Sequence, residues 1–255
     1  MADARDPNKI VESLVGWLKE HAERTGTGGF VFGLSGGIDS AVVCGLAARA
    51  VGRDHCLGVV MPIGNVAEDE DLGRRVAETF GVRLAAPDLL PTFEALEASL
   101  RAERDALRME ATGPEAALLA SANLKPRLRM LTLYHFANLL NYLVVGTGNR
   151  AELTVGYFTK HGDSGVDLLP LGDLTKGEVR AVAQVLGVPA RVIERPPSAG
   201  LWEGQTDEEE MGLTYDDIDR YIAEGSSGDA EVDREIRRRW DGSAHKRATA
   251  PIARP

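Results

Sequence analysis

The sequence predicts an α/β fold, a doubly wound parallel sheet flanked by helices. Three short apolar runs, near residues 30–33, 56–61 and 82–85, alternate with helical patterns, and this β-α-β-α-β order is typical of such sheets. A glycine-rich turn directly follows the first run, at the strand end where ligands of these folds bind. At 255 residues and 44% hydrophobic content, the chain can form one such domain over its whole length, residues 1–255.

In the first half of the chain, the residue pattern predicts each of these helices and strands in order. Asp6-Pro7 is a typical helix start, and Ile10, Leu14 and Leu18 recur at helical spacing after it. From there the pattern predicts a helix to about residue 24, a strand from 30, a buried helix over 38–50, a strand over 56–61, an amphipathic helix over 68–80 and a strand over 82–85.

The second half is richer in helices. The segment 126–143 is apolar around most of its circumference, which leaves two interpretations open, an inner core helix or a subunit interface. A polar loop over 156–170 shows no period, and long loops often carry function. We expect a flexible link near 224–230 and a flexible tail over 241–255. Further elements are expected as helices over 94–108, 115–124, 175–186, 207–212, 215–223 and 231–240, with a strand over 143–146.

The glycine turn is the main functional signal. A strand, a glycine turn and a helix start place unpartnered amides and the positive end of the helix dipole together, which favours binding of a phosphate. Asp39 would repel that phosphate unless a divalent cation lies between them. The turn also fits the G-x-S-x-G elbow of serine hydrolases through Ser35, and a glycine turn without chemistry is a third interpretation. The candidate nucleotide-binding residues here are Gly33, Leu34, Ser35, Gly36, Gly37, Ile38, Asp39 and Ser40.

A metal site at this turn requires a second carboxylate. Glu152 follows the strand predicted over 143–146, and parallel strands present their carboxyl ends at one edge of a sheet. Asp39 and Glu152 could therefore share a cation such as Mg²⁺. A polyphosphate also needs cationic side chains, each of which could alternatively be an ordinary surface charge. The candidates are Arg127, Lys160, Lys176 and Lys246.

The net charge, the cysteine positions and the lengths of the apolar runs argue against several classes of protein. A net charge of −10 disfavours a uniformly basic surface for nucleic acid. The two cysteines, Cys44 and Cys56, fall in a predicted helix and strand, where we expect small buried hydrophobic residues. The sequence has no apolar run of about eighteen residues and no signal-peptide core. We therefore expect a cytoplasmic protein that binds neither nucleic acid nor membrane.

Several stretches match one enzyme family in order along nearly the whole chain. They are SGGIDS (35–40), NLKPRLR (123–129), GTGNRAE (146–152), GYFTKHGD (156–163), DLLPL (167–171), LTK (174–176), PSAGLWEGQTDE (197–208) and HK (245–246). In these stretches the chain resembles the ammonia-dependent NAD synthetases, which belong to the SGGxDS group of ATP pyrophosphatases. The first stretch marks only the wider group, whereas GYFTKHGD and PSAGLWEGQTDE point to this family. The resemblance implies an adenine nucleotide alpha hydrolase-like fold of the ATP pyrophosphatase type.

The resemblance also implies a reaction in two steps. The nicotinate carboxylate of nicotinic acid adenine dinucleotide, or deamido-NAD, attacks the α-phosphorus of ATP, so that pyrophosphate leaves and an acyl-adenylate forms. Ammonia then attacks the acyl carbon and gives NAD and AMP, the last step of NAD biosynthesis. Glutamine-using relatives carry an additional amidase domain, and only one helix precedes the first strand here, so we expect free ammonia as the donor. In the family the second substrate lies at a dimer interface, which implies a homodimer.

The resemblance assigns roles to individual residues. It implies Mg²⁺ held by Asp39 and Glu152, and catalytic roles for Lys176, Ser35 and Asp163, the last beside the incoming ammonia. The implied ATP contacts beyond the glycine turn are Thr147, Lys176 and Ser198. The implied deamido-NAD contacts are Asn123, Arg127, Lys160, Asp167, His245 and Lys246.

Three rival functions stay open at this point. One is another ATP pyrophosphatase amidoligase with a different carboxylate acceptor. A serine hydrolase using Ser35 is the second, and it would need a partner histidine, for which His245 is a late candidate in a basic tail. The third is a non-catalytic module that binds an adenine nucleotide, which leaves Asp39, Glu152 and Lys160 unexplained.

Overall fold

The centre of the computed structural model is a parallel sheet, and the structure describes residues 5–64, 67–198 and 206–254. Four strands in these ranges are ordered β3-β2-β1-β4, and every pairing is parallel. The predicted fold class is therefore confirmed. The strands are β1 (Phe30–Gly33), β2 (Cys56–Val59), β3 (Arg83–Ala85) and β4 (Leu143–Val144).

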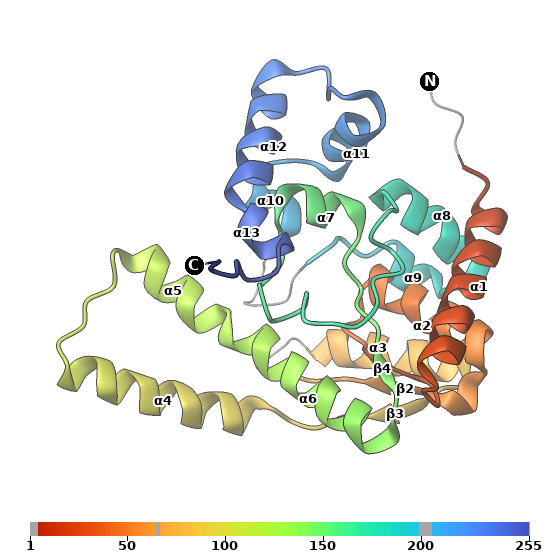
Figure 1. The fold of residues 1–255 in the computed structure, drawn as a ribbon, viewed down its shortest axis with the longest axis horizontal. Helices are drawn as coiled ribbons and strands as arrows, with labels where there is room; N and C mark the ends of the chain where they lie inside the picture. Colours follow the sequence, from red (N-terminus) through yellow and green to blue (C-terminus); the bar gives the residue numbers. More distant parts are fainter. Residues whose placement is uncertain (1–4, 65–66, 199–205, 255) are drawn as a thin grey trace.

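The two faces of the sheet are covered by different helices (Figure 1). Along β1, Phe30 and Phe32 pack into one hydrophobic cluster and Val31 into another, because successive side chains of a strand point to opposite faces. The helices on the first face are α1 (Pro7–Thr25), α2 (Ile38–Val51), α3 (Ala67–Phe80) and α8 (Lys176–Leu186), and α6 (Leu124–Leu140) covers the second.

The sequence predicts the strand at Leu143 longer than it is. Only Leu143 and Val144 pair with β1, whereas Val145 forms a bridge with Leu168. The carboxylate of Asp167 accepts a hydrogen bond from the Val144 amide at 2.8 Å. The polar loop after residue 156 therefore returns alongside β4 and extends the edge of the sheet.

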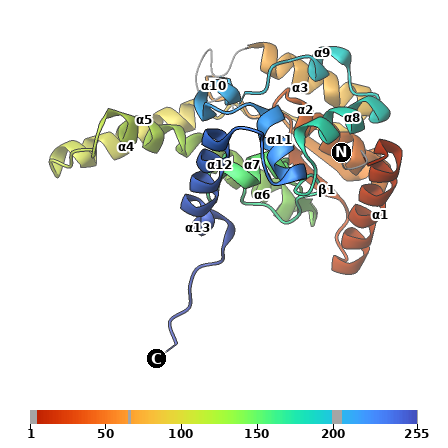
Figure 2. The ribbon, with the colours of Figure 1, turned by 90° about the horizontal axis from the view of Figure 1, so that it is seen from above.

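The remaining helices lie beyond the carboxyl ends of the strands or project from the sheet. Figures 1 and 2 both show α4 and α5 extending away from the rest of the molecule. The sequence analysis does not predict the short helices α9 and α13, because a helix of four residues is too short to show a helical periodicity. These elements are α4 (Leu90–Ala106), α5 (Pro114–Ala122), α7 (Arg150–Val155), α9 (Ala190–Ile193), α10 (Asp207–Met211), α11 (Tyr215–Glu224), α12 (Ala230–Gly242) and α13 (Ala244–Arg247).

The interpretation of residues 126–143 as an inner core helix is wrong for this chain alone. α6 buries Leu133 and Ala137 against the sheet, but Leu131 is 63% exposed and Leu139 is 71% exposed. The helix also ends at Leu140, where the chain turns into β4. One side of α6 is therefore open and carries two large apolar residues among polar ones, which is compatible with the interface interpretation.

The region after residue 206 packs on α7 rather than on the sheet. Ile218 of α11 and Ile236 of α12 are fully buried in a cluster with Ala151 and Val155. Between α11 and α12, the amide and hydroxyl of Ser227 each donate to Asp233 at 2.7 Å. This segment has defined contacts, and the flexibility expected near 224–230 stays a prediction. Within the described ranges, no helix is both long enough and apolar enough to cross a membrane.

Candidate active site

The glycine turn between β1 and α2 approaches α3 closely. Gly36 has a φ of 79°, and a Cβ there would lie 2.6 Å from the carbonyl oxygen of Asp69. The Ser40 hydroxyl donates to the Gly37 carbonyl at 2.8 Å, and the Gly37 amide donates to the Ser35 hydroxyl at 3.3 Å. The turn is therefore held by its own hydroxyl groups and leaves no room for a side chain at Gly36.

Ser35 lacks the partner that a nucleophilic serine needs. Among the described residues, its hydroxyl contacts only the Gly37 amide and the Ser40 hydroxyl, the latter at 3.3 Å. A serine nucleophile requires an adjacent general base, normally a histidine. The geometry therefore disfavours the hydrolase interpretation.

Three helices begin beside the turn, and they differ in whether side chains cap their first backbone amides. α7 and α8 each begin with a capping box, in which the side chains of Asn149 and Thr175 accept from backbone amides. α2 begins after Gly37, and no side chain in the described part of the chain caps it. The start of α2 is therefore the one of these three that keeps amides open for an anion.

A buried lysine lies between two carboxylates at this point. The Lys176 side chain is 1% exposed, and its Nζ lies 2.5 Å from Asp39 Oδ2 and 3.9 Å from Glu152 Oε1. Burial opposes the charge of Lys176, but the two carboxylates outweigh it, so the pKa of Lys176 is raised. Desolvation first, and the charge of Asp39 second, raise the pKa of Glu152.

Asn149 connects this cluster to the start of α7, a role that the sequence analysis missed. Its Nδ2 donates to Asp39 Oδ1 at 3.0 Å, while its Oδ1 accepts from the Glu152 amide at 3.0 Å. The residue is fully buried. The pattern N-x-x-E after a predicted strand end was the signal that could have revealed it, because that spacing is typical of a capping box.

A third carboxylate lies close to the same lysine. Asp207 accepts from the Tyr215 hydroxyl at 2.8 Å, and that hydroxyl is also 3.5 Å from Glu152 Oε1. The other oxygen of Asp207 is buried and has no hydrogen-bond partner among the described residues. Desolvation raises the pKa of Asp207. When ionised, three carboxylates near one ammonium carry more negative charge than Lys176 neutralises, and a further cation would stabilise that ionised form.

The donor set fits Mg²⁺. Asp39 and Glu152 both reach the Lys176 ammonium, which shows that a single cation can lie near both. Mg²⁺ is usually held by one or two carboxylates, with phosphate oxygens and water completing its shell. The described residues contain no group of three or more acidic, histidine or cysteine side chains arranged to hold a metal alone.

The first part of the loop predicted over 156–170 is tied to the region of α13. Lys160 Nζ donates to the carbonyl of His245 at 2.7 Å. Lys246 Nζ donates to the carbonyls of Gly156 and Phe158, each at 2.8 Å. Residues that are 85 or more positions apart in sequence thus meet at the second end of the site.

Asp163 lies in the same loop and faces the cavity. Its Oδ1 accepts from the Thr159 amide at 2.8 Å, and the Thr159 hydroxyl donates to Asn123 Oδ1 at 2.6 Å. Arg127 reaches the carbonyl of Lys160 at 3.4 Å. Solvent in the cavity reaches Asp163, but the protein around the cavity desolvates it enough to raise its pKa.

One cavity of about 550 Å³ joins the two ends. Gly36 and Asp167 do not line it: Gly36 is buried where the turn packs against α3, and Asp167 supports the sheet edge, where it also accepts from the Tyr134 hydroxyl. The predicted stretch 199–205 lies outside the described residues. The predicted residues that line the cavity are Gly33, Leu34, Ser35, Gly37, Ile38, Asp39, Ser40, Asn123, Arg127, Thr147, Glu152, Lys160, Asp163, Lys176, Ser198, His245 and Lys246.

Comparison with known proteins places this chain in a family. The family model described as NAD synthase matches residues 10–250. The chain belongs to the NAD synthase family. The NH(3)-dependent NAD(+) synthetase of Carboxydothermus hydrogenoformans is 49% identical over 236 residues, covering 92% of this chain and 93% of the relative. The enzyme of that name from Archaeoglobus fulgidus is 44% identical over 254 residues, with 96% of both chains covered.

Solved structures of similar proteins share the fold. The structure of NMN synthetase from Francisella tularensis has a TM-score of 0.88 and 35% identity, covering 98% of this chain and 99% of that chain. The NH3-dependent NAD synthetase from Campylobacter jejuni has a TM-score of 0.78 and 25% identity, covering 98% of this chain and all of that chain.

Substitutions at Asn149 separate its two roles. Asn149→Ala removes both the helix cap and the donor to Asp39, so we expect the free energy of unfolding to fall by about 1–3 kcal/mol. Asn149→Ser keeps a cap acceptor and should recover about 1 kcal/mol of that loss. Urea unfolding measures both values, and equal stability of the two variants would show that the cap contributes nothing.

Proposed function

We propose that this chain catalyses the ATP-dependent amidation of nicotinic acid adenine dinucleotide with ammonia, giving NAD, AMP and pyrophosphate. The protein is then a ligase that forms a carbon–nitrogen bond and supplies the last step of NAD biosynthesis. One observation carries the proposal: in a member of the NAD synthase family, the open start of α2, the buried Lys176 and the carboxylates of Asp39 and Glu152 meet in one cavity.

The end of the cavity at the glycine turn is proposed to bind ATP. Amides and hydroxyls of residues 33–40 would bind the phosphates, with Thr147 and Ser198 as further contacts. Lys176 would stabilise the charge that develops on the departing pyrophosphate, because preorganised positive charge in a desolvated site acts most strongly there. The Ser35 hydroxyl, which is exposed to the cavity, would donate to the reacting group.

Asp39 and Glu152 are proposed to hold Mg²⁺. When bound, the ion would neutralise part of the triphosphate charge and so permit a polyanion beside three carboxylates. The protein's own contribution is to fix the two carboxylates: Asn149 donates to Asp39, and the capping box orients Glu152.

The other end of the cavity is proposed to bind deamido-NAD. Asp163 would orient ammonium and accept its proton, since a carboxylate with a raised pKa is a better base than an ordinary one. Asp167 stays in the proposed set, although it supports the sheet edge outside the cavity lining. The residues proposed to contact deamido-NAD are Asn123, Arg127, Lys160, Asp167, His245 and Lys246.

The identity of the acceptor has one specific rival. The Francisella tularensis structure is described as an NMN synthetase, and it resembles this chain with a TM-score of 0.88. A mononucleotide acceptor is therefore the second candidate. Ammonia is proposed as the donor in both cases, because the relatives that match over nearly their whole length are NH(3)-dependent.

The decisive experiment is an assay of the purified chain with ATP, Mg²⁺ and ammonium. We expect AMP and NAD to form in equal amounts with deamido-NAD, and at least ~10-fold less product with nicotinic acid mononucleotide. Glutamine in place of ammonium should give no product. Faster turnover of the mononucleotide than of deamido-NAD would show that the mononucleotide is the acceptor. ATP cleavage without any acid acceptor would contradict both candidates.

The metal proposal predicts the effect of neutralising each ligand. Asp39→Asn and Glu152→Gln should each lower kcat by at least ~100-fold, because a charge facing the cation is lost. The exposed Glu12 of α1 supplies a matched control, Glu12→Gln, which should leave kcat unchanged. Initial rates at several Mg²⁺ concentrations measure the effect, and wild-type activity of Glu152→Gln at any of them would remove Glu152 from the metal site.

We also propose that two copies associate through the side formed by α4, α5 and α6. These helices and the chain directly after α4 carry several large apolar residues that are exposed in the single chain, and a second copy packed against them would bury part of that surface. They are Leu100, Leu107, Met109, Leu118, Leu119, Leu131 and Leu139.

The homodimer proposal predicts a change of mass in solution. Leu131→Glu combined with Leu139→Glu should convert a particle of twice the 27.4 kDa chain mass into a monomer, because two charges would be buried in the interface. The control Ile252→Glu changes an 86% exposed residue in the tail and should leave the mass unchanged. Light scattering after size exclusion measures both, and a dimer that survives the double substitution would place the interface elsewhere.

The remaining proposals concern organisation. We propose that residues 1–255 act as a single domain, supported by one family match over residues 10–250. We also propose that the enzyme works in the cytoplasm. Its two cysteines, Cys44 and Cys56, are free and buried, and the reaction consumes ATP.

A further inference from the structure

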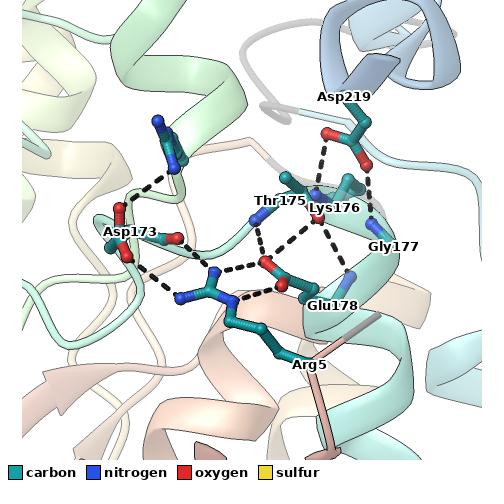
Figure 3. A network of polar contacts seen from close by, with 8 residues as sticks. Arg5, Asp173, Thr175, Lys176, Gly177, Glu178 and Asp219 are labelled. Atoms are coloured by element: carbon teal, nitrogen blue, oxygen red, sulfur yellow. Dashed lines mark hydrogen bonds and ion pairs between the residues drawn. The ribbon is translucent and has the colours of Figure 1, made fainter. Parts of the chain in front are cut away.

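Asp219 is a carboxylate outside the cavity that meets the start of α8. It lies on α11, 43 positions after Lys176. One of its oxygens accepts from the Lys176 amide at 3.0 Å and the other from the Gly177 amide at 2.8 Å. Figure 3 shows both bonds, with the Asp219 side chain reaching down from α11 to the first turn of α8.

Asp219 and the capping box together satisfy every amide of the first turn of α8. The Thr175 hydroxyl accepts from the Glu178 amide, and Asp219 takes the two amides before it. A helix start that is filled in this way cannot bind a phosphate through its own amides. α8 therefore contributes its lysine side chain to the cavity, whereas α2 contributes amides.

The same side of α11 also contacts the far end of Lys176. Tyr215 lies four residues before Asp219, so both side chains fall on one side of the helix. The Lys176 Nζ is 4.7 Å from the centre of the Tyr215 ring, while Asp219 holds the Lys176 amide. α11 thus holds Lys176 at its backbone and beside its ammonium.

Other contacts on α8 stabilise the helix without touching the lysine backbone. Arg5 pairs with Glu178 at 2.6 Å and with Asp173 at 3.0 Å, and Figure 3 places this network on the other side of the turn from Asp219. The Arg5–Asp173 pair is largely exposed and contributes little to stability. The bidentate Arg5–Glu178 pair holds the glutamate that caps the Thr175 amide, not the amide of Lys176. Asp219 is therefore the side chain in this network that fixes the position of the Lys176 backbone.

We infer that Asp219 is a positioning residue for Lys176, and that it holds the backbone of α8 so that the ammonium lies where the ATP phosphates bind. This inference rests on the proposed role of Lys176 toward ATP. The carboxylate acts at a distance from the substrate, so its removal should affect only what Lys176 does.

The test is a double-mutant cycle on ATP binding, measured by calorimetry with Mg²⁺ and without acceptor or ammonia. Lys176→Met should weaken ATP binding by about 10- to 100-fold, the range of one charge-assisted hydrogen bond. Asp219→Ala should weaken it by about 5- to 20-fold, and Asp219→Asn, which keeps one acceptor, by about half as much. In the Lys176→Met background, Asp219→Ala should change the affinity less than about twofold, because nothing is left to position.

The matched control is Asp216→Ala, which removes an exposed carboxylate from the same helix and should leave ATP affinity unchanged. Circular dichroism and thermal unfolding verify the fold of each variant, and Asp219→Asn replaces Asp219→Ala if the latter unfolds. In turnover assays, the KM for the acceptor should stay within about twofold while kcat falls.

Two results would overturn the inference: the same loss of ATP affinity in both backgrounds, or tighter ATP binding once the α8 amides are freed. Neither depends on the acceptor. A chain that binds ATP but amidates another acid would contradict the proposed function and leave the cycle interpretable.

Discussion

The site depends on one buried ammonium held between carboxylates from two different strand ends. Asp39 follows β1 and Glu152 follows β4, and Lys176 arrives from a third segment to lie between them. Taking these charges out of water is costly, and their mutual attraction offsets that cost only while all three keep their positions. Asp207 adds a third carboxylate, and burial together with the neighbouring carboxylates raises the pKa values of Glu152 and Asp207, so the cluster in its ionised form would repel a bare triphosphate. It suits a nucleotide that arrives with a metal ion.

This constraint explains why three helix starts at one edge of the sheet are built differently. A helix start attracts anions, so three open starts would compete for the same phosphates. Only α2 is left open; α7 uses its start to orient Glu152, and α8 uses its start to fix Lys176. This edge of the sheet therefore presents open amides, which favour an anion, beside carboxylates, which favour a cation.

Sequence patterns predicted the parallel sheet and the open helix start well, because both are local. The strand at Phe30 and the turn that follows it carry their own signals, and Glu152 is predicted from its place after a strand. Asn149 was missed because a capping asparagine has the same sequence pattern whether or not its side chain also donates to Asp39. Asp219 could not be predicted at all, since a carboxylate on an amphipathic helix carries no sign of the amides it meets 43 positions away. The sequence left the role of α6 open because apolar residues around a helix do not say what covers them.

The open side of α6 bears on the acceptor end of the cavity. Arg127 and Leu131 are four residues apart, so the cavity-lining arginine and the exposed leucine lie on one side of the helix. A copy packed against Leu131 would therefore also approach Arg127 and close the cavity from that end. Closure would desolvate the acceptor and strengthen its charge contacts with Arg127 and Lys160. By linkage, an acceptor that bound the closed form more tightly would also stabilise the proposed dimer, so acceptor affinity and dimer stability would depend on each other.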